Sequence, residues 1–374
     1  MRVLHVYRTY FPDTQGGLEE VIRQICKNTI SHQVESRVLT LSDDPDPAII
    51  ERDEAYVYRY KCTFEVASCG MSFSAIAGFK QLVEWADIIH YHFPWPFADL
   101  LHLLSDVKKP SVMTYHSDVV RQKELLWFYR PLMHYFLGRM DRIVATSPNY
   151  AATSETLALF RDKVEVIPIG LNMDSYPLLN SQVLELMKAR VGDGFFLFIG
   201  VLRYYKGLNI LLDAIKDSDL KVVIVGSGPV ERELHQQAER LGLDNVHFLG
   251  RVDDDEKVAL IELSRAMVFP SHLRSEAFGV TLLEGAMYGK PLISTEIGTG
   301  TSYVNEHNVT GFVVTPNDAQ SLRDAMMRLH QDAELAAEMG RAAHKRYEAL
   351  FTGLMMGERY ARLYESVLDT QRLS

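Results

Sequence analysis

Two glutamates eight positions apart, Glu276 and Glu284, are the residues of this chain whose types and spacing best suit chemistry. They belong to the segment HLRSEAFGVTLLE, which follows an apolar run closed by Pro270. This pattern predicts a strand, then a polar loop carrying Glu276, then a helix with Glu284 about two turns in and on a similar face. Unpaired N–H groups at a helix start attract anions. Two carboxylates beside such a turn suit a ligand with hydroxyls and phosphate; the alternative is a helix-cap acid and an exposed helix charge.

A second candidate group is the cation pair Arg203 and Lys206, which follows the apolar run Phe195–Ile199. Arginine holds phosphate oxygens with a planar fork of N–H donors, and lysine acts as a point charge. We expect the pair to hold a diphosphate, the alternative being ordinary surface charge. Gly226 and Gly228 follow the next predicted strand. They lack the Gly-Lys-Ser/Thr of a P-loop and the third glycine of the dinucleotide fingerprint, so neither motif is present.

At the N-terminus, the paired glycines Gly16 and Gly17 stand between a predicted strand, Arg2–Tyr7, and a predicted helix, Leu18–Thr29. This order is typical of a Rossmann-like βα unit. Glycine lets a backbone approach a ligand closely, so we expect a substrate contact here, the alternative being a tight turn.

His116 directly follows the predicted strand Ser111–Tyr115, and His92 and Trp95 also lie near a strand end. Ligands in parallel α/β folds bind at the carboxyl ends of strands. A neutral imidazole there can hydrogen-bond a sugar hydroxyl or a developing charge. We therefore expect His116 to be functional, against the alternative of a structural histidine.

A basic and aromatic segment from Arg121 to Arg142 departs from the acidic character of the chain. Its cations include Arg121, Lys123 and Arg130, interleaved with tryptophan, phenylalanine and tyrosine. Such a segment suits a membrane surface or a lipid phosphate. The alternative is a helical region with one core face and one solvated face.

Length and composition bound the remaining possibilities. The chain has 374 residues, enough for two domains, and a net charge of −10, which argues against nucleic-acid binding. Its three cysteines have no metal-ligand spacing and cannot all pair, which favours a reducing cytoplasm. We find no signal peptide and no apolar run of 18 residues or more.

Strand and helix patterns alternate along the chain, which predicts an α/β fold with two Rossmann-like domains of similar size, facing across a cleft. The boundaries we expect are residues 1–170 for the N-terminal domain, 171–354 for the C-terminal domain, and 355–374 for a last helix that crosses back to the first domain. The turn-rich stretch from Pro168 to Pro177 is the expected linker.

Taken together, these residues resemble the retaining glycosyltransferases of family 4, which have the GT-B fold. The resemblance covers nearly the whole chain. It implies that the C-terminal domain binds a sugar nucleotide and the N-terminal domain binds the acceptor, without a cofactor or a metal. It assigns catalytic roles to His116, Arg203, Lys206 and Glu276, and substrate binding to Gly16, Gly17, Gly226, Gly228, Phe278, Gly279 and Glu284.

Within that family, strings such as YHFPWPFADLLHL and FPSHLRSEAFGVTLLEGA look like those of bacterial O-polysaccharide mannosyl- and rhamnosyltransferases. This implies GDP-mannose or GDP-rhamnose as donor, a polyprenyl-diphosphate-linked saccharide as acceptor, and a place at the inner face of the cytoplasmic membrane. Ala277 departs from the family, because many relatives have proline there. A transferase using a UDP-sugar, a sugar-nucleotide epimerase of the same fold and a non-catalytic sugar-nucleotide sensor are the alternatives.

Overall fold

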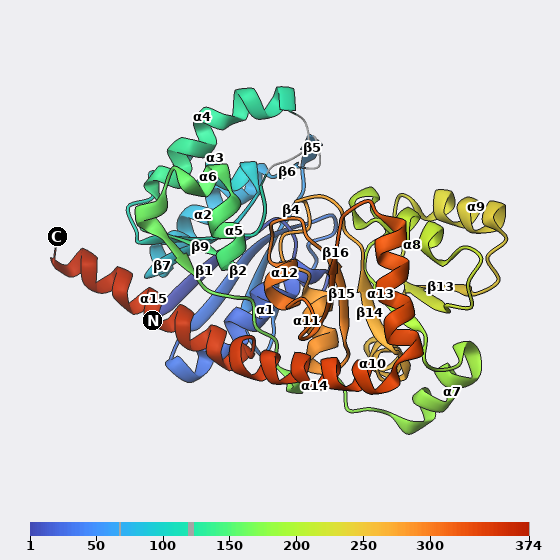
Figure 1. The fold of residues 1–374 in the computed structure, drawn as a ribbon. Helices are drawn as coiled ribbons and strands as arrows, with labels where there is room; N and C mark the ends of the chain where they lie inside the picture. Colours follow the sequence, from blue (N-terminus) through green and yellow to red (C-terminus); the bar gives the residue numbers. More distant parts are fainter. Residues whose placement is uncertain (67–68, 119–122, 374) are drawn as a thin grey trace. The chain divides into compact units, whose positions relative to one another are not determined.

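The chain folds into two α/β units, seen in a computed structural model that describes residues 1–66, 69–118 and 123–373 (Figure 1). Unit 1 comprises Met1–Gly170 and Gly353–Ser374, and unit 2 comprises Leu171–Thr352. Each unit has its own sheet and its own hydrophobic core.

The sheet of unit 1 has the strand order β10-β9-β8-β7-β1-β2-β4-β3 and is parallel except for the antiparallel edge strand β3. A separate hairpin pairs β5 with β6. The strands are β1 (Arg2–Val6), β2 (Glu35–Ser42), β3 (Ile49–Glu51), β4 (Tyr56–Lys61), β5 (Phe64–Val66), β6 (Cys69–Met71), β7 (Ile88–Phe93), β8 (Ser111–Tyr115), β9 (Arg142–Ala145) and β10 (Val164–Val166).

Helices cover this sheet because each βαβ crossover must return along a face of the sheet. They are α1 (Gly17–Thr29), α2 (Phe73–Trp85), α3 (Pro96–Leu104), α4 (Lys123–Arg139), α5 (Pro148–Thr153), α6 (Glu155–Ala158) and α15 (Gly353–Leu373), with short 3-10 turns η1 (Ile30–His32) and η2 (Arg161–Lys163). In Figure 1, α15 (red) runs beside α1 (blue). The two helices approach closely because Gly357 packs against Asn28; a Cβ on Gly357 would lie 2.4 Å from the Asn28 carbonyl oxygen.

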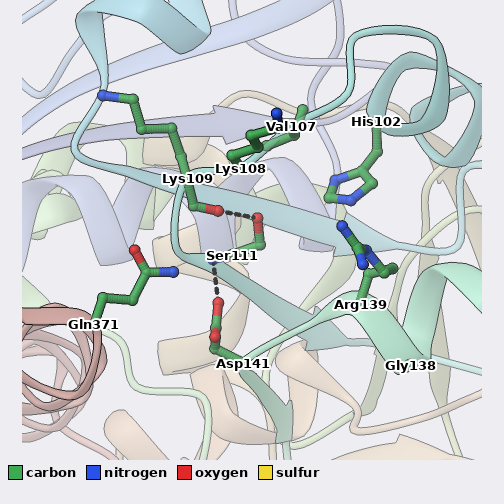
Figure 2. Close-up of a pocket in the computed structure, with 9 residues that line it drawn as sticks. All are labelled: His102, Val107, Lys108, Lys109, Ser111, Gly138, Arg139, Asp141 and Gln371. Atoms are coloured by element: carbon green, nitrogen blue, oxygen red, sulfur yellow. Dashed lines mark hydrogen bonds between the residues drawn. The ribbon is translucent and has the colours of Figure 1, made fainter. Parts of the chain in front are cut away.

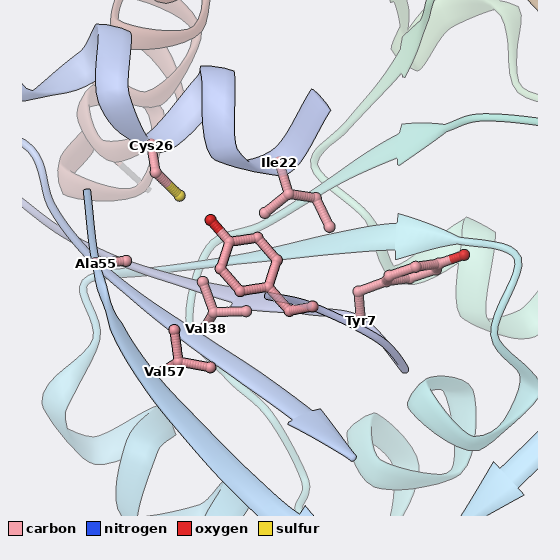
Figure 3. Packing of buried hydrophobic residues seen from close by; sticks show 7 residues of the cluster. Tyr7, Ile22, Cys26, Val38, Ala55 and Val57 are labelled. Carbon is pink, nitrogen blue, oxygen red and sulfur yellow. The ribbon is translucent and has the colours of Figure 1, made fainter. Parts of the chain in front are cut away.

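A buried cluster fixes α1 on the sheet and so positions the loop that precedes it. Its members come from the loop after β1, from α1 and β2, and from β4 and the residue before it, and are Tyr7, Tyr10, Ile22, Cys26, Val38, Ala55 and Val57 (Figure 3). The amphipathic pattern of α1 places Val21, Ile22 and Ile25 in the interior. All three cysteines of the chain are free thiols.

Unit 2 has a six-stranded parallel sheet with the order β13-β12-β11-β14-β15-β16. In chain order this is 3-2-1-4-5-6, the Rossmann arrangement, in which ligands bind where β11 and its neighbour β14 diverge. The strands are β11 (Phe196–Ile199), β12 (Val222–Val225), β13 (Val246–Gly250), β14 (Ala266–Phe269), β15 (Leu292–Thr295) and β16 (Gly311–Val314). The helices are α7 (Ser181–Val191), α8 (Leu208–Ile215), α9 (Glu231–Leu241), α10 (Asp254–Leu263), α11 (Val280–Met287), α12 (Thr301–Val304), α13 (Ala319–Gln331) and α14 (Ala333–Leu350), with η3 (Met173–Ser175) and η4 (Tyr204–Lys206).

The predicted α/β class is confirmed, and the structure adds elements that the sequence patterns did not indicate. These are the three-residue strands β3, β5 and β6, and helix α7, which lies beyond the segment we expected to be an irregular linker. Helix α7 begins after Asn180, whose side chain accepts hydrogen bonds from two backbone N–H groups of the first turn.

Candidate functional site

In unit 2, the loops after β11 and β14 are joined by an ion pair between Lys206 and Glu276. The pair is largely shielded from water, since the two side chains are only 12% and 11% exposed. The Ser271 hydroxyl donates a 3.4 Å hydrogen bond to the same carboxylate, and the Lys206 ammonium lies 4.5 Å from the centre of the Phe269 ring. Two of the predicted catalytic residues therefore meet at the point where the Rossmann topology places a ligand.

Arg203, the other predicted phosphate cation, stands three residues before Lys206 and directly before the η4 turn. Its side chain is exposed. Within the described ranges, no carboxylate lies within ion-pair distance of it. The site therefore offers one cation already paired with Glu276 and one cation open to an anionic ligand.

Glu284 lies on α11 and is 7% exposed. Its carboxylate accepts a 2.9 Å hydrogen bond from the Tyr176 hydroxyl and lies 3.2 Å from the Lys257 ammonium. Burial alone would lower the pKa of Lys257, but the carboxylates of Glu284 and Asp254 outweigh it, so the pKa is raised and the lysine stays charged. The Glu284 side chain is thus held in place by a hydroxyl and a lysine that stays charged.

The position of Glu284 corrects one expectation. Helix α11 begins at Val280, so Glu284 is just over one turn into the helix rather than two, and Glu276 lies in the preceding loop. The two carboxylates are therefore not related by helical periodicity. Instead, Gly279 starts the helix in the left-handed region, with a φ of 85°, and turns the loop back toward β14.

Phe278, predicted to bind substrate, has a buried side chain that is 3% exposed. Its ring packs edge-on against Phe351. A Cβ on Gly300 would lie only 2.6 Å from Cδ2 of this ring. The Gly300 N–H donates a 2.7 Å hydrogen bond to the Ala277 carbonyl. The ring of Phe278 therefore anchors the loop, and the substrate-binding role of Phe278 remains a prediction.

The glycines Gly226 and Gly228 lie in the loop after β12 and pack against the loop after β11. A Cβ on Gly226 would lie 2.1 Å from the Gly200 carbonyl oxygen, and one on Gly228 would lie 2.4 Å from the Leu202 carbonyl oxygen. Close packing of the two loops thus requires glycine at both positions, whatever ligand binds beside them. Their predicted contact with the sugar nucleotide remains a prediction.

In unit 1, Gly16 and Gly17 stand at the start of α1, as predicted. No side chain caps this helix start, but its first turn carries Glu19 and Glu20. The Thr14 hydroxyl donates a 2.9 Å hydrogen bond to Glu19, and Arg23 pairs with Glu20. These acids already offset part of the helix dipole, so an anion at Gly16 and Gly17 would face a partly neutralised site.

His116 follows β8 and is one of four histidines that lie together in the core of unit 1. It lies 3.1 Å from His92, which lies 3.1 Å from His5. His90 is hydrogen-bonded through both ring nitrogens, at 2.7 Å each, to the hydroxyls of Tyr364 and Thr114. Burial lowers the pKa of His116 and His5 to about 3. Burial and the neighbouring imidazoles lower the pKa of His90 and His92 as well, so all four are neutral near pH 7.

Ring nitrogens of His5, His90 and His92 also lie within 4.8 Å of one another, a spacing that a metal ion could use. No metal motif was apparent in the sequence. Hydrogen bonds already engage both nitrogens of His90 and both of His92. These hydrogen bonds are therefore sufficient to explain why the histidine rings lie close together, without a metal ion.

Among the predicted membrane residues, Arg121 lies outside the described residues and Lys123 is the first residue of α4. Arg130 is exposed on the same helix. Trp127 and Phe128 are 72% and 75% exposed, and their rings contact each other edge to face. Within the described ranges, no helix is long and apolar enough to cross a bilayer.

Unit 1 also contains a polar pocket, which lies away from the predicted catalytic residue His116 (Figure 2). It opens at the amino end of β8, where the Ser111 N–H donates a hydrogen bond to the Asp141 carboxylate. Lys108, Lys109 and Arg139 also line it. Because His116 follows the opposite end of β8, the pocket is not part of the predicted site.

Two residues that hold the site were missed by sequence reasoning, namely Tyr176 and Lys257. Tyr176 is 108 positions from Glu284 in sequence and lies in the turn-rich segment we expected to be a linker. Lys257 follows the acidic start of α10, where Asp253 and Glu256 form a capping box. Neither residue carries a pattern that points to a carboxylate on another element.

Replacing Lys206 by Met should destabilise unit 2 by about 3 kcal/mol, because it leaves the Glu276 carboxylate shielded and without its cation. The double variant Lys206→Met/Glu276→Gln should regain most of this loss. Urea unfolding followed by far-ultraviolet circular dichroism measures both, with Lys216→Met, at an exposed lysine of the same unit, as the control. Equal stability of the single variant and the control would contradict the assigned ion pair.

Unit 1 should lose stability as the pH falls below about 6.5, because the unfolded chain protonates histidines whose pKa the fold lowers. Each such histidine contributes up to about 1.4 kcal/mol per pH unit, present in full above the unfolded pKa and lost toward the folded pKa. All three tryptophans lie in unit 1, so their fluorescence reports its unfolding by urea between about pH 7 and pH 5. The variant His90→Gln should show a shallower slope, and the exposed-site variant His32→Gln an unchanged one. A pH-independent midpoint would rule out neutral burial of the cluster.

Comparison with known proteins identifies the family. A model of glycosyl transferases group 1 matches residues 187–346, and a model of glycosyltransferase family 4 matches residues 15–175. The D-rhamnosyltransferase WbpZ of Pseudomonas aeruginosa is 56% identical over 352 residues, which cover 94% of this chain and 92% of the relative. The O-antigen chain mannosyltransferase C of Escherichia coli is 47% identical over 371 residues, covering 99% and 100% of the two chains.

Solved structures agree in fold. Sucrose-phosphate synthase from Thermosynechococcus elongatus has a TM-score of 0.81 at 19% identity, with 99% of each chain covered. Anabaena HepE in complex with UDP and glucose has a TM-score of 0.79 at 20% identity, with 98% of this chain and 100% of the other covered. The predicted resemblance is confirmed, and this chain is a glycosyltransferase of family 4 with two Rossmann-like units of the GT-B fold.

Proposed function

We propose that this enzyme transfers a D-mannosyl or D-rhamnosyl residue from a GDP-sugar to a polyprenyl-diphosphate-linked saccharide during O-polysaccharide assembly. The two relatives at 56% and 47% identity carry the names of a D-rhamnosyltransferase and an O-antigen mannosyltransferase. D-rhamnose is D-mannose without the 6-hydroxyl group. The same kind of binding site therefore suits either sugar, and the residues around carbon 6 would decide between them. The observation that carries the proposal is the ion pair of Lys206 with Glu276 beside the junction of β11 and β14, with the exposed Arg203 three residues before Lys206 on the same loop.

These three residues suit the charge that sugar transfer generates. Cleavage of the sugar–phosphate bond leaves negative charge on the departing diphosphate and positive charge on the anomeric carbon. Arg203 and Lys206 would stabilise the leaving diphosphate, an effect typically worth a factor of about 100–1000 in rate for each preorganised donor. Glu276 forms an ion pair with Lys206. Once the diphosphate pairs with the Lys206 ammonium, the Glu276 carboxylate would be released to accept hydrogen bonds from the sugar hydroxyls.

We assign the nucleotide ribose to Glu284, because a carboxylate positioned by Lys257 can accept hydrogen bonds from two adjacent hydroxyls. Transfer would retain the anomeric configuration by front-face attack, with a phosphate oxygen of the leaving group taking the proton of the acceptor hydroxyl. This route requires no protein nucleophile and no metal. Unit 1 would bind the acceptor, with His116 acting on the donor sugar and the Gly16–Gly17 backbone beside the phosphates.

We assign membrane contact to α4, which would bring the enzyme to a lipid-linked acceptor at the inner face of the cytoplasmic membrane. Its exposed Trp127 and Phe128 offer apolar surface, and Arg130 offers a cation beside them. Aromatic rings next to basic side chains are the composition of helices that lie in a bilayer interface.

Turnover by mass spectrometry tests the donor and the reaction together. With a synthetic lipid-diphosphate saccharide, we expect a single added hexose or deoxyhexose from GDP-mannose or GDP-D-rhamnose, and none from UDP-sugars. Nuclear magnetic resonance of the product should show the same anomeric configuration as the donor. Transfer from a UDP-sugar alone would overturn the donor assignment, and conversion of the donor without an acceptor would favour an epimerase.

Membrane contact is tested by co-sedimentation with vesicles that contain anionic phospholipid. The variant Trp127→Ser/Phe128→Ser should weaken binding by about tenfold or more, because two large apolar side chains lose their place in the interface. Leu186→Ser, which changes an apolar residue 60% exposed on α7, is the matched control. Neutralising Arg121, Lys123 and Arg130 together should remove the dependence on anionic lipid. Equal binding of all variants would contradict the assignment.

A further inference from the structure

Three imidazoles form a hydrogen-bonded row that leads from the core of unit 1 to the predicted catalytic residue His116. His5 lies on β1, His92 on β7, and His116 directly after β8, so the row crosses three neighbouring strands. His5 Nδ1 lies 3.1 Å from His92 Nε2, and His92 Nδ1 lies 3.1 Å from His116 Nε2. Successive ring planes are inclined by only 21° and 22°, so the rings are nearly parallel along the row.

The protons of these rings depend on one another. Each neutral imidazole has one N–H group and one bare nitrogen, and each hydrogen bond between two rings needs one of each. Only two arrangements therefore satisfy both bonds. In one, every ring carries its proton on Nε2, and in the other, every ring carries it on Nδ1.

The inner end of the row distinguishes the two arrangements. His5 is fully buried, and its Nε2 has no hydrogen-bond partner in the described part of the chain. A proton on that nitrogen would be an orphaned N–H group in the core, which proteins tolerate less well than a bare acceptor. The favoured arrangement places the proton of His5 on Nδ1, where it bonds His92, and therefore places the proton of every ring on Nδ1.

We propose that His5 and His92 are positioning residues that set His116 in its Nδ1–H tautomer. Its Nε2 accepts the proton of His92, and its Nδ1–H faces the substrate as a hydrogen-bond donor. The ligand group it suits is an acceptor oxygen, such as a hydroxyl or phosphoryl oxygen of the sugar nucleotide. The proposal rests on the role proposed above for His116, and it adds two residues and a direction of donation to that role.

The alternative occupant of this cluster is a metal ion held by His5, His90 and His92. A metal would need a bare nitrogen from each ring. His90 already bonds two hydroxyls and His92 already bonds two imidazoles, so metal binding would have to break the row. Measuring whether the chain contains a bound metal ion therefore distinguishes the hydrogen-bonded row from a metal site.

The direct test is the tautomer of His116 in the wild-type chain without ligand. Long-range ¹H–¹⁵N correlation spectra of chain labelled with ¹⁵N-histidine distinguish the protonated nitrogen from the bare one, and the His116→Gln spectrum assigns the signals. We expect Nδ1 protonated, the less populated tautomer of free histidine in water. A proton on Nε2, or one bound metal ion per chain by elemental analysis, would overturn the proposal. This measurement needs no turnover, so it stands apart from any failure of the donor assignment.

A pair of variants links the tautomer to catalysis. His92→Leu removes both hydrogen bonds of the row, and we expect a mixed His116 tautomer and a kcat about 10–100-fold lower with little change in acceptor KM. His92→Asn keeps an N–H donor near the Nδ1 position and should restore most of the loss. In a His116→Ala background, His92→Leu should have no further effect on kcat.

The control for these variants is His102→Gln, which alters a buried histidine hydrogen-bonded to Tyr91 and outside the row. It should lower stability without changing the His116 spectrum or kcat. Equal kcat losses for His102→Gln and His92→Leu, or an equal effect of His92→Leu with and without His116, would show a merely structural role and would contradict the proposal.

Discussion

The parallel pairing of β11 with β14 is the constraint on which the candidate site of unit 2 depends. Because the two strands run side by side in the same direction, the loops that leave their carboxyl ends emerge at the same edge of the sheet. One loop carries Arg203 and Lys206, and the other carries Glu276. The ion pair between Lys206 and Glu276 then closes the two loops on each other. Residues seventy positions apart in sequence form one ion pair for this topological reason.

The two units stabilise their buried polar side chains by different interactions. Unit 2 pairs each buried carboxylate of the site with a lysine, Lys206 for Glu276 and Lys257 for Glu284. Unit 1 instead keeps the four clustered histidines neutral, because burial lowers their pKa and their hydrogen bonds join them to other neutral groups. Fixed charge suits the unit proposed to hold a diphosphate. A neutral, hydrogen-bonding imidazole suits the contact with an oxygen of the sugar nucleotide that is proposed for His116.

Sequence reasoning predicted the parts of this molecule that local pattern determines. The apolar runs of the central strands and the polar loops after them placed Gly16, Arg203 and Glu276 correctly in loops that follow strands. It failed where tertiary contacts decide. The tyrosine that holds Glu284 is far away in sequence, and His5 lies within an apolar strand whose register with β7 no local pattern reveals. The expected helical relation of Glu276 and Glu284 was wrong, because Gly279 delays the start of α11.

The central claim is that the junction of β11 and β14 holds the diphosphate of a GDP-sugar, and calorimetric titration with GDP tests it most directly. Arg203 is the open cation of the site, so Arg203→Ala should weaken GDP binding by about tenfold or more. Arg190→Ala, at an exposed arginine on α7, should leave binding unchanged. GDP binding of equal strength in the wild-type chain and in Arg203→Ala would contradict the account.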